Sequence, residues 1–199
     1  MESYDWMERV LTDRSALPDA AIHADWRVRY VAAVAMGRTG DPAFLPVLSA
    51  MLVREDGRPL YEQPRASFPG SHDDTRMAEQ IRVVHEVFDR VAGEDEREAW
   101  KCRGRVKQAC LFAVGDIGGA DETLRRKVEA YLVETDDVVR MAAARALGRI
   151  GNTGSLPALE QLLDVPEFCS RTEARKATDR LQHASVESSA TVESAGGEA

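Results

Sequence analysis

Side chains that could bind a metal or transfer a proton are few and widely spaced in this sequence. The histidines are His23, His72, His85 and His183. No two of them have the H-E-x-x-H or H-x-x-x-H spacing that places two imidazoles on one face of a helix. His85 is followed by Glu86, but one such pair supplies too few ligands for a catalytic metal. We therefore expect no metal site and no cofactor.

The densest group of possible ligands is His72, Asp73 and Asp74. These residues precede a segment with helical periodicity, so capping of that helix by either aspartate accounts for them. The sequence has neither a Gly-rich phosphate loop nor a nucleophile elbow, because its recurrent glycines close helices and do not open them. No catalytic residue is indicated, and a protein without enzymatic activity is favoured over an enzyme.

The cysteines, Cys102, Cys110 and Cys169, include no C-x-x-C motif. Cys102 and Cys110 fall on one expected helix, where eight residues rise about 12 Å, too far for a disulfide. Unpaired cysteines indicate a reducing, cytoplasmic compartment. The first residues do not resemble a signal peptide, and no apolar run reaches the ~20 residues of a membrane span. We therefore expect no membrane association.

The chain is acidic, with 26 Lys and Arg against 34 Asp and Glu and a net charge of −8. Such a chain is not expected to bind nucleic acid through its overall field. Arg103, Arg105 and Lys107 could form a local basic stripe, but their interpretation as a solvated helix face is favoured. The expected partner is therefore another protein, not a nucleic acid.

One cation recurs near the start of an internal repeat, as Arg29, Lys107 and Arg140. A repeated cation could serve catalysis by binding an anion. It could also hydrogen-bond acidic residues or carbonyls in the turn of a neighbouring repeat and so form a ladder between repeats. We favour the ladder, because paired charges often have structural roles.

The element that positions the last of these cations is a helical hairpin over residues 137–163. We expect Gly148 and Gly151 to stop its first helix, because glycine enters left-handed backbone conformations without a steric penalty. Ser155 can cap the second helix, and Pro157 fits its first turn. Apolar residues recur in the first helix at spacings of three and four, at Val139, Ala143, Ala146, Leu147 and Ile150.

The same spacing occurs in residues 25–52 and 105–132. In these copies Gly37 and Gly115 follow the recurrent cation by the interval that separates Gly148 from its own cation. Repeats of this length predict an all-α solenoid, in which each helical hairpin packs mainly against its neighbours.

These residues resemble the HEAT family, and in particular the short HEAT-like repeats of phycobilisome lyases. The family pattern is an acidic residue, Val-Arg, an alanine-rich helix ending in Leu-Gly, and a glycine-containing turn. It is matched by Asp137, Val139-Arg140, Leu147-Gly148 and Gly151. The first copy has Met36 in place of leucine, and the middle copy departs further. The resemblance implies a right-handed α-solenoid of about four HEAT-like hairpins with a long insertion loop.

The expected HEAT-like domain spans residues 1–183, and a disordered acidic tail follows at 184–199 because that segment has almost nothing to bury. Residues 54–73 contain several prolines and glycines and are expected to form the insertion loop, within a diverged fourth unit. Tyr61 and Phe68 in this loop are candidate anchors, either on a partner or on the chain's own domain.

Capping elements are expected at the two ends of the solenoid. An amphipathic helix from Ser3 to about Arg14 would cap the first repeat. A capping box of Ser170 and Glu173 would open a last helix that ends near His183.

In HEAT folds the Val-Arg helices line the concave face. If Val28, Val106 and Val139 point into the core, the next-but-one residue and the residue four further on point outward. These positions are Tyr30, Val34, Gln108, Phe112, Met141 and Arg145. Four of the six are apolar or aromatic, which is unusual for exposed helix positions, so we predict a partner-binding strip. The alternative is that the insertion or the terminal helices cover it.

The predicted function is a non-catalytic scaffold, adaptor or accessory subunit that binds another protein through the concave face. The resemblance also raises a subunit of a bilin-lyase-type enzyme or a chromophore chaperone. The His85-Glu86 pair is similar to those of HEAT-repeat iron hydroxylases, which carry such pairs in several symmetric repeats and not in one. The sequence fixes neither the partner nor the oligomeric state.

Overall fold

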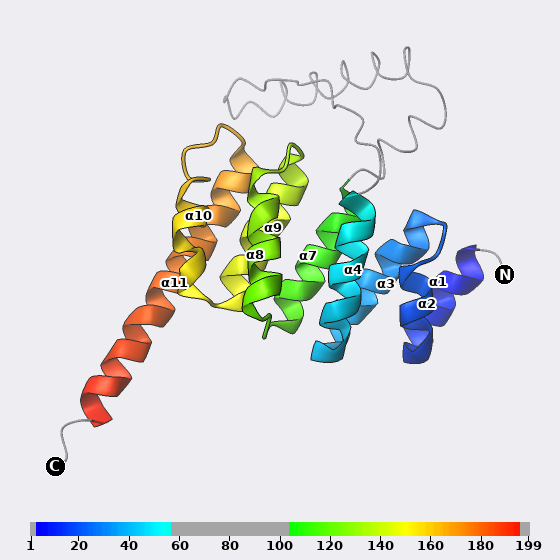
Figure 1. Ribbon diagram of the computed structural model, residues 1–199, viewed down its shortest axis with the longest axis horizontal. Coiled ribbons are helices and arrows are strands. Elements are labelled where there is room, and N and C mark those ends of the chain that lie inside the picture. The colour runs from blue at the N-terminus through cyan, green and yellow to red at the C-terminus, as the bar shows by residue number, and fades with distance from the viewer. Residues whose placement is uncertain (1–2, 57–103, 196–199) are drawn as a thin grey trace. The chain divides into compact units, whose positions relative to one another are not determined.

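The computed structural model describes residues 3–56 and 104–195, where every element is an α-helix or a short 3₁₀ turn (Figure 1). This confirms the predicted all-α, HEAT-like solenoid. Most of the predicted insertion loop, with Tyr61 and Phe68, lies outside the described residues. The α-helices are α1 (Ser3–Thr12), α2 (Leu17–Ala21), α3 (Trp26–Thr39), α4 (Leu45–Asp56), α7 (Arg105–Ile117), α8 (Glu122–Ala130), α9 (Asp137–Ile150), α10 (Leu156–Glu160) and α11 (Phe168–Ala195).

The first helices of successive hairpins form one row, in which α1 packs on α3, α3 on α7, α7 on α9 and α9 on α11. The second helices α2, α4, α8 and α10 lie beside this row as another layer (Figure 1). Side chains from both layers, such as Leu48, Leu111, Val128 and Leu147, are fully buried between them. The core is therefore a chain of contacts between neighbouring repeats, as expected for a solenoid.

The ends of the first helices carry the caps that their sequences favour. The side chains of Asp25 and Asp136 accept hydrogen bonds, each 2.9 Å long, from the backbone N–H two residues later, at the starts of α3 and α9. Gly40 and Gly151 end the same helices with φ of 64° and 81°, in the left-handed region that glycine enters freely.

The recurrent glycines Gly37, Gly115 and Gly148 have a different role from the one predicted. They lie inside the last turns of their helices and are buried, so the prediction that they stop these helices is wrong. A Cβ on Gly37, Gly115 or Gly148 would lie 2.8, 2.8 or 2.7 Å from the Cα of Ala113, Ala146 or Ala177, respectively. The missing side chain therefore lets each first helix approach the backbone of the next one.

The N-terminal segment is a further hairpin and not a single capping helix. Asp13 accepts a hydrogen bond of 2.9 Å from the Ser15 N–H, and the 3₁₀ turn that follows leads into α2 at Leu17-Pro18. Turns capped by Asp41 and Asn152 lead into Leu45-Pro46 of α4 and Leu156-Pro157 of α10 in the same way. Asn152 thus takes the capping role that was predicted for Ser155, whose side chain makes no cap hydrogen bond.

The last helix also differs from its prediction. α11 begins at Phe168, before the predicted capping box, and Ser170 is buried within its first turn. The Ser170 hydroxyl donates to the carbonyl oxygen of Asp137 at 3.2 Å, so it ties α11 to α9 instead of capping a helix. α11 then continues past His183 to Ala195, through residues for which composition predicts disorder.

Candidate functional site

The predicted strip lies on a continuous surface of the first helices, which we call the outer face. It comprises three positions on each helix: seven residues before the recurrent glycine, three before it and one after it. On α11, Asp179 stands at the glycine position. The members are Tyr30, Val34 and Arg38 on α3, Gln108, Phe112 and Asp116 on α7, Met141, Arg145 and Arg149 on α9, and Thr172, Lys176 and Arg180 on α11.

The six predicted strip residues are left open by the part of the chain that the structure describes. Five of them are half-buried and Arg145 is exposed. Tyr30, Val34 and Phe112 pack their inner atoms against the hydrophobic core and leave the rest at the surface. α1 packs on α3 without burying Tyr30 completely. Among the described elements, none covers this strip as the alternative interpretation required.

An apolar groove lies between α3 and α7 on this face. Its volume is about 330 Å³, and Tyr30, Val34, Gln108 and Phe112 all line it. Gly37, Ala109 and Ala113 also line it and are buried, whereas Arg38, Arg105 and Asp116 are its exposed polar residues. Its volume is at the low end of the roughly 300–1,000 Å³ typical of ligand pockets, which suits one large side chain better than a cofactor.

A basic patch lies next to this groove, at α9 and α11. A second hollow of about 250 Å³ is lined there by Arg145, Arg149, Glu173, Lys176, Ala177 and Arg180. Lys176 pairs with Glu173 at 2.6 Å, and Arg149 pairs with Asp116 of α7. Within the described ranges, Arg145 and Arg180 form no ion pair. We call Arg145, Arg149, Lys176 and Arg180 the basic patch.

Arg145 connects the basic patch to the apolar groove. Its guanidinium carbon lies 4.7 Å from the centroid of the Phe112 ring, a distance at which the ring attracts a cation. The predicted residues Gln108 and Phe112 thus belong to the groove and Arg145 belongs to the patch. Met141 lies in neither, although it shares the outer face with both.

The recurrent cations lie at one end of the helices, away from the outer face, and they form the predicted ladder. Arg29 is 1% exposed, and its guanidinium donates to the carbonyls of His23 and Ala24 at 2.8 and 2.7 Å and to Glu55 at 2.7 Å. The two carbonyls precede α3 and Glu55 lies at the end of α4, so one side chain joins the entrance and the exit of a hairpin.

Arg140 repeats this arrangement one hairpin further along. It donates to the carbonyls of Glu134 and Thr135 at 2.7 and 3.2 Å and pairs with Glu167 at 3.1 Å. Lys107 uses its single ammonium group to join Asp56 at 2.9 Å with Glu134 at 3.1 Å. Burial opposes a charged lysine, but these hydrogen bonds outweigh it and raise the pKa of Lys107.

The structure adds a fourth cation to the ladder, which the internal repeats of the sequence do not reveal. Arg171 at the start of α11 donates to the carbonyls of Val165 and Pro166 at 2.8 and 3.3 Å, six and five residues before it, as Arg29 and Arg140 do. α11 therefore begins as the first helix of another repeat. The missing signal is the glycine eight residues after the cation, where this helix has Asp179.

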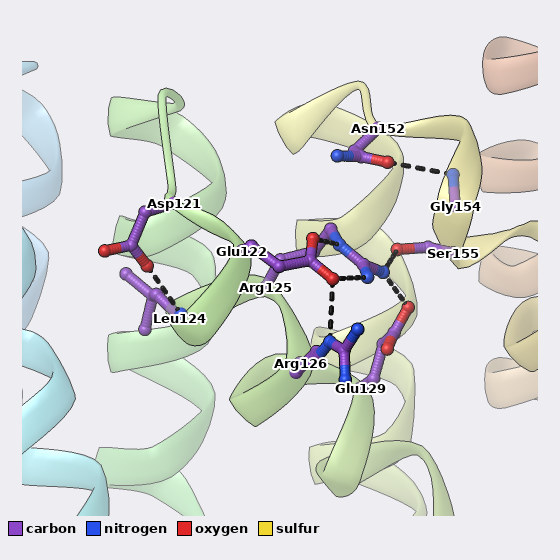
Figure 2. Close-up of polar contacts among 9 residues, drawn as sticks. All are labelled: Asp121, Glu122, Leu124, Arg125, Arg126, Glu129, Asn152, Gly154 and Ser155. Atoms are coloured by element: carbon purple, nitrogen blue, oxygen red, sulfur yellow. Dashed lines mark hydrogen bonds and ion pairs between the residues drawn. The ribbon is translucent and has the colours of Figure 1, made fainter.

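Arg125 also links two elements through hydrogen bonds, here helix α8 and the turn before α10 in the second layer (Figure 2). It is buried, it binds Glu122 and Glu129 of its own helix, and it donates to the Ser155 hydroxyl at 2.8 Å. The hydrogen bonds that Glu122 accepts from Arg125 and Arg126 lower the pKa of the Glu122 carboxyl to about 2. Such a carboxyl stays charged near neutral pH, so this cluster stabilises the packing and offers no general acid.

Nucleophilic and metal chemistry find little support in the described residues. Burial raises the pKa of the thiols of Cys110 and Cys169, so neither is a ready thiolate. Burial, together with a 2.6 Å hydrogen bond to Asp56, also raises the pKa of the Tyr131 hydroxyl. In these ranges no three His, Cys, Asp or Glu side chains gather as metal ligands. His72 and His85 lie outside the described residues.

Two comparisons place this architecture among known proteins. A family model described as HEAT repeats matches residues 101–184, which supports a HEAT-repeat family and says nothing of the phycobilisome-lyase type. A solved structure of human deoxyhypusine hydroxylase in complex with glycerol is similar, at 20% sequence identity over 92% of this chain and 81% of that chain, with a TM-score of 0.38. No curated protein matches the sequence. None of the helices in the described part of the chain is long and apolar enough to cross a membrane.

Proposed function

We propose that this protein is a non-catalytic scaffold or accessory subunit that binds another protein through the outer face. HEAT repeats generally mediate protein–protein interaction, and the observation that supports this face is the apolar groove between α3 and α7. Tyr30 and Phe112 line a surface hollow, next to the fully buried Arg29 and Leu111 of the same helices. An aromatic-lined hollow of this kind is typical of the position where a partner's anchor side chain binds.

The size of the outer face also suits a protein partner. Neighbouring packed helices lie about 8–10 Å apart, so the row from α3 to α11 extends over roughly 24–30 Å. A stable interface buries about 800 Å² on each partner, which a face of that length can supply. The residue types fit as well, because Tyr, Phe, Met and Arg are enriched at interfaces.

Affinity capture from the native host tests this proposal. Tagged wild-type protein is compared with the double variant Tyr30→Glu/Phe112→Glu and with Val133→Glu, and the captured proteins are identified by mass spectrometry. Val133 is a matched control, because it is an apolar residue that is 81% exposed near the end of the second-layer helix α8. We expect wild type and Val133→Glu to capture the same partner and the double variant to lose it.

Circular dichroism and urea unfolding of the same three proteins show whether the loss is specific. Tyr30 and Phe112 are half-buried, so the double variant is expected to be less stable but still folded. Retention of the partner by the folded double variant would overturn the proposal. Visible absorbance that co-purifies with the wild-type protein would instead support the chromophore-handling alternative.

A further inference from the structure

We propose that the bound partner segment is an acidic amphipathic peptide, with one apolar side chain in the groove and carboxylates against the basic patch. This inference rests on the proposed function, because it names the chemistry of the partner that the same face would bind.

At one of its three positions, the outer face changes in one direction along the row of first helices. Three residues before the glycine position, the side chain is apolar in the first two helices and cationic in the last two. One residue after that position, the last two helices again carry cations, as α3 does, whereas α7 carries an aspartate. The positions compared are Val34, Phe112, Arg145 and Lys176, and then Arg38, Asp116, Arg149 and Arg180. Only the last two helices are cationic at both positions, so the carboxylates of a partner are best matched there and its apolar side chain at the first two helices.

The basic patch has more positive charge than its neighbours neutralise. Its four cations are accompanied by two carboxylates, Asp116 and Glu173, each already paired with one of them. The side chains of Arg149 and Lys176 are still 40% and 62% exposed. This excess lies on a chain whose net charge is −8, so it is a local feature that the overall composition opposes. Partner carboxylates would gain charge-assisted hydrogen bonds here.

A peptide fits these observations better than a nucleic acid does. A long polyanion would bring most of its phosphates near a protein of net charge −8, and only the few cations of the patch would attract them. The groove between α3 and α7 is lined by apolar and aromatic side chains together with Arg38, Arg105, Gln108 and Asp116, and its volume suits one large side chain. A peptide can place an aromatic or aliphatic residue in the groove and its acidic residues only at the patch.

The separation of the two sites sets the length of the segment. The groove lies between α3 and α7 and the patch between α9 and α11, two helix spacings away, which is about 16–20 Å. A helical peptide covers that distance in about 13 residues at 1.5 Å each, and an extended one in about six. A segment of about 16 residues therefore reaches both sites in either conformation.

Selection from a random peptide library tests the inference without assuming a sequence. The probe is a displayed library of random peptides of about 16 residues, long enough to span both sites as a helix. It is selected on the wild-type protein and counter-selected on Arg145→Glu/Arg180→Glu. We expect the enriched peptides to combine an aromatic or large aliphatic residue with a cluster of Asp or Glu. Enrichment of basic or uncharged peptides would overturn the inference.

Affinities of the enriched peptides measure the two halves of the face separately. By fluorescence anisotropy we expect Arg145→Glu/Arg180→Glu to weaken binding about tenfold or more, with a further loss as salt is raised. Arg54→Glu/Arg126→Glu is the matched control, because both arginines are exposed on the second-layer helices α4 and α8. Equal losses in both variants, or tighter binding of a single-stranded oligonucleotide than of any peptide, would contradict the proposal.

The partner-capture assay distinguishes failure of this inference from failure of the proposed function. If Arg145→Glu/Arg180→Glu still captures the partner while Tyr30→Glu/Phe112→Glu loses it, the acidic-peptide inference is wrong and the proposed function stands. If both variants keep the partner, both proposals fail. If both lose it and the control variant does not, both are supported.

Discussion

Two sets of cations on the same helices contrast in every physical respect. The ladder cations Arg29 and Arg140 are engaged by backbone carbonyls and by a glutamate, and Arg29 is almost completely buried. The outer-face cations Arg145 and Arg180 are exposed and have no ion pair among the described residues. The first set recurs from repeat to repeat, whereas the second belongs to the basic patch, which lies at α9 and α11 alone among the described helices. In this protein, recurrence marks what holds the repeats together, and divergence marks the surface available to a partner.

The largest effect is expected from removing a ladder cation. Arg29→Met should lower the free energy of unfolding by about 4 kcal/mol, because it removes a buried guanidinium that hydrogen-bonds Glu55 and the carbonyls of His23 and Ala24. Urea unfolding followed by circular dichroism measures the change, and Arg145→Met is the matched control. A loss of stability no greater than that of the control would contradict the structural role of the ladder.

The next largest effect is expected where two first helices approach closely. Gly115→Val should lower the free energy of unfolding by about 3 kcal/mol, because its side chain would meet the backbone of Ala146. Ala130→Val, at an exposed position of α8, controls for the lower helix propensity of valine. Thermal unfolding of the two variants should separate them clearly, and similar melting temperatures would show that the contact is not tight.

A smaller, pH-dependent effect is expected at the Arg125 cluster. The pKa of Glu122 is lowered from its ordinary value of 4.5 to about 2, so its ion pairs contribute their full stability above pH 4.5 and lose it as the pH falls through 2. Glu122→Gln should therefore be less stable than wild type at neutral pH, and this difference should shrink on acidification. Urea unfolding at several pH values measures it, and a difference that grows toward low pH would contradict this assignment.

The smallest effect on stability is expected on the outer face. Arg145→Met should change the free energy of unfolding by no more than about 0.5 kcal/mol, since the side chain is exposed and only stacks on Phe112. The same variant should bind enriched acidic peptides more weakly than wild type does. Anisotropy and urea unfolding on one preparation test both statements, and a stable variant with unchanged binding would separate Arg145 from the proposed interface.

The sequence predicts the repeats well, because helix periodicity and capping act over a few residues. Gly151 could be placed at the end of its helix for that reason. The sequence could not distinguish a glycine that stops a helix from one that admits a neighbouring backbone, since both positions require glycine. Gly148 was assigned to the wrong one of these roles, because its contact with Ala177 depends on a helix that was taken for a cap.

The sequence predicts some residues of the outer face and not others. The 3.6-residue period places Tyr30 and Phe112 outward, and the structure brings them to one groove. The basic patch was missed, because Lys176 and Arg180 belong to α11, whose repeat identity is visible only in the contacts of Arg171. The N-terminal hairpin escaped notice too, although Leu17-Pro18 repeats the start of the later second helices.

Asp179 gives the far end of the row a property that the interior interfaces lack. At the α3–α7, α7–α9 and α9–α11 interfaces a bare glycine backbone lies against the adjoining helix, whereas the corresponding position of α11 is the exposed Asp179. A helix from another molecule could not pack as closely against α11 without dehydrating the Asp179 carboxylate. We therefore expect Asp179 to oppose the close stacking of a helix from a second molecule on α11.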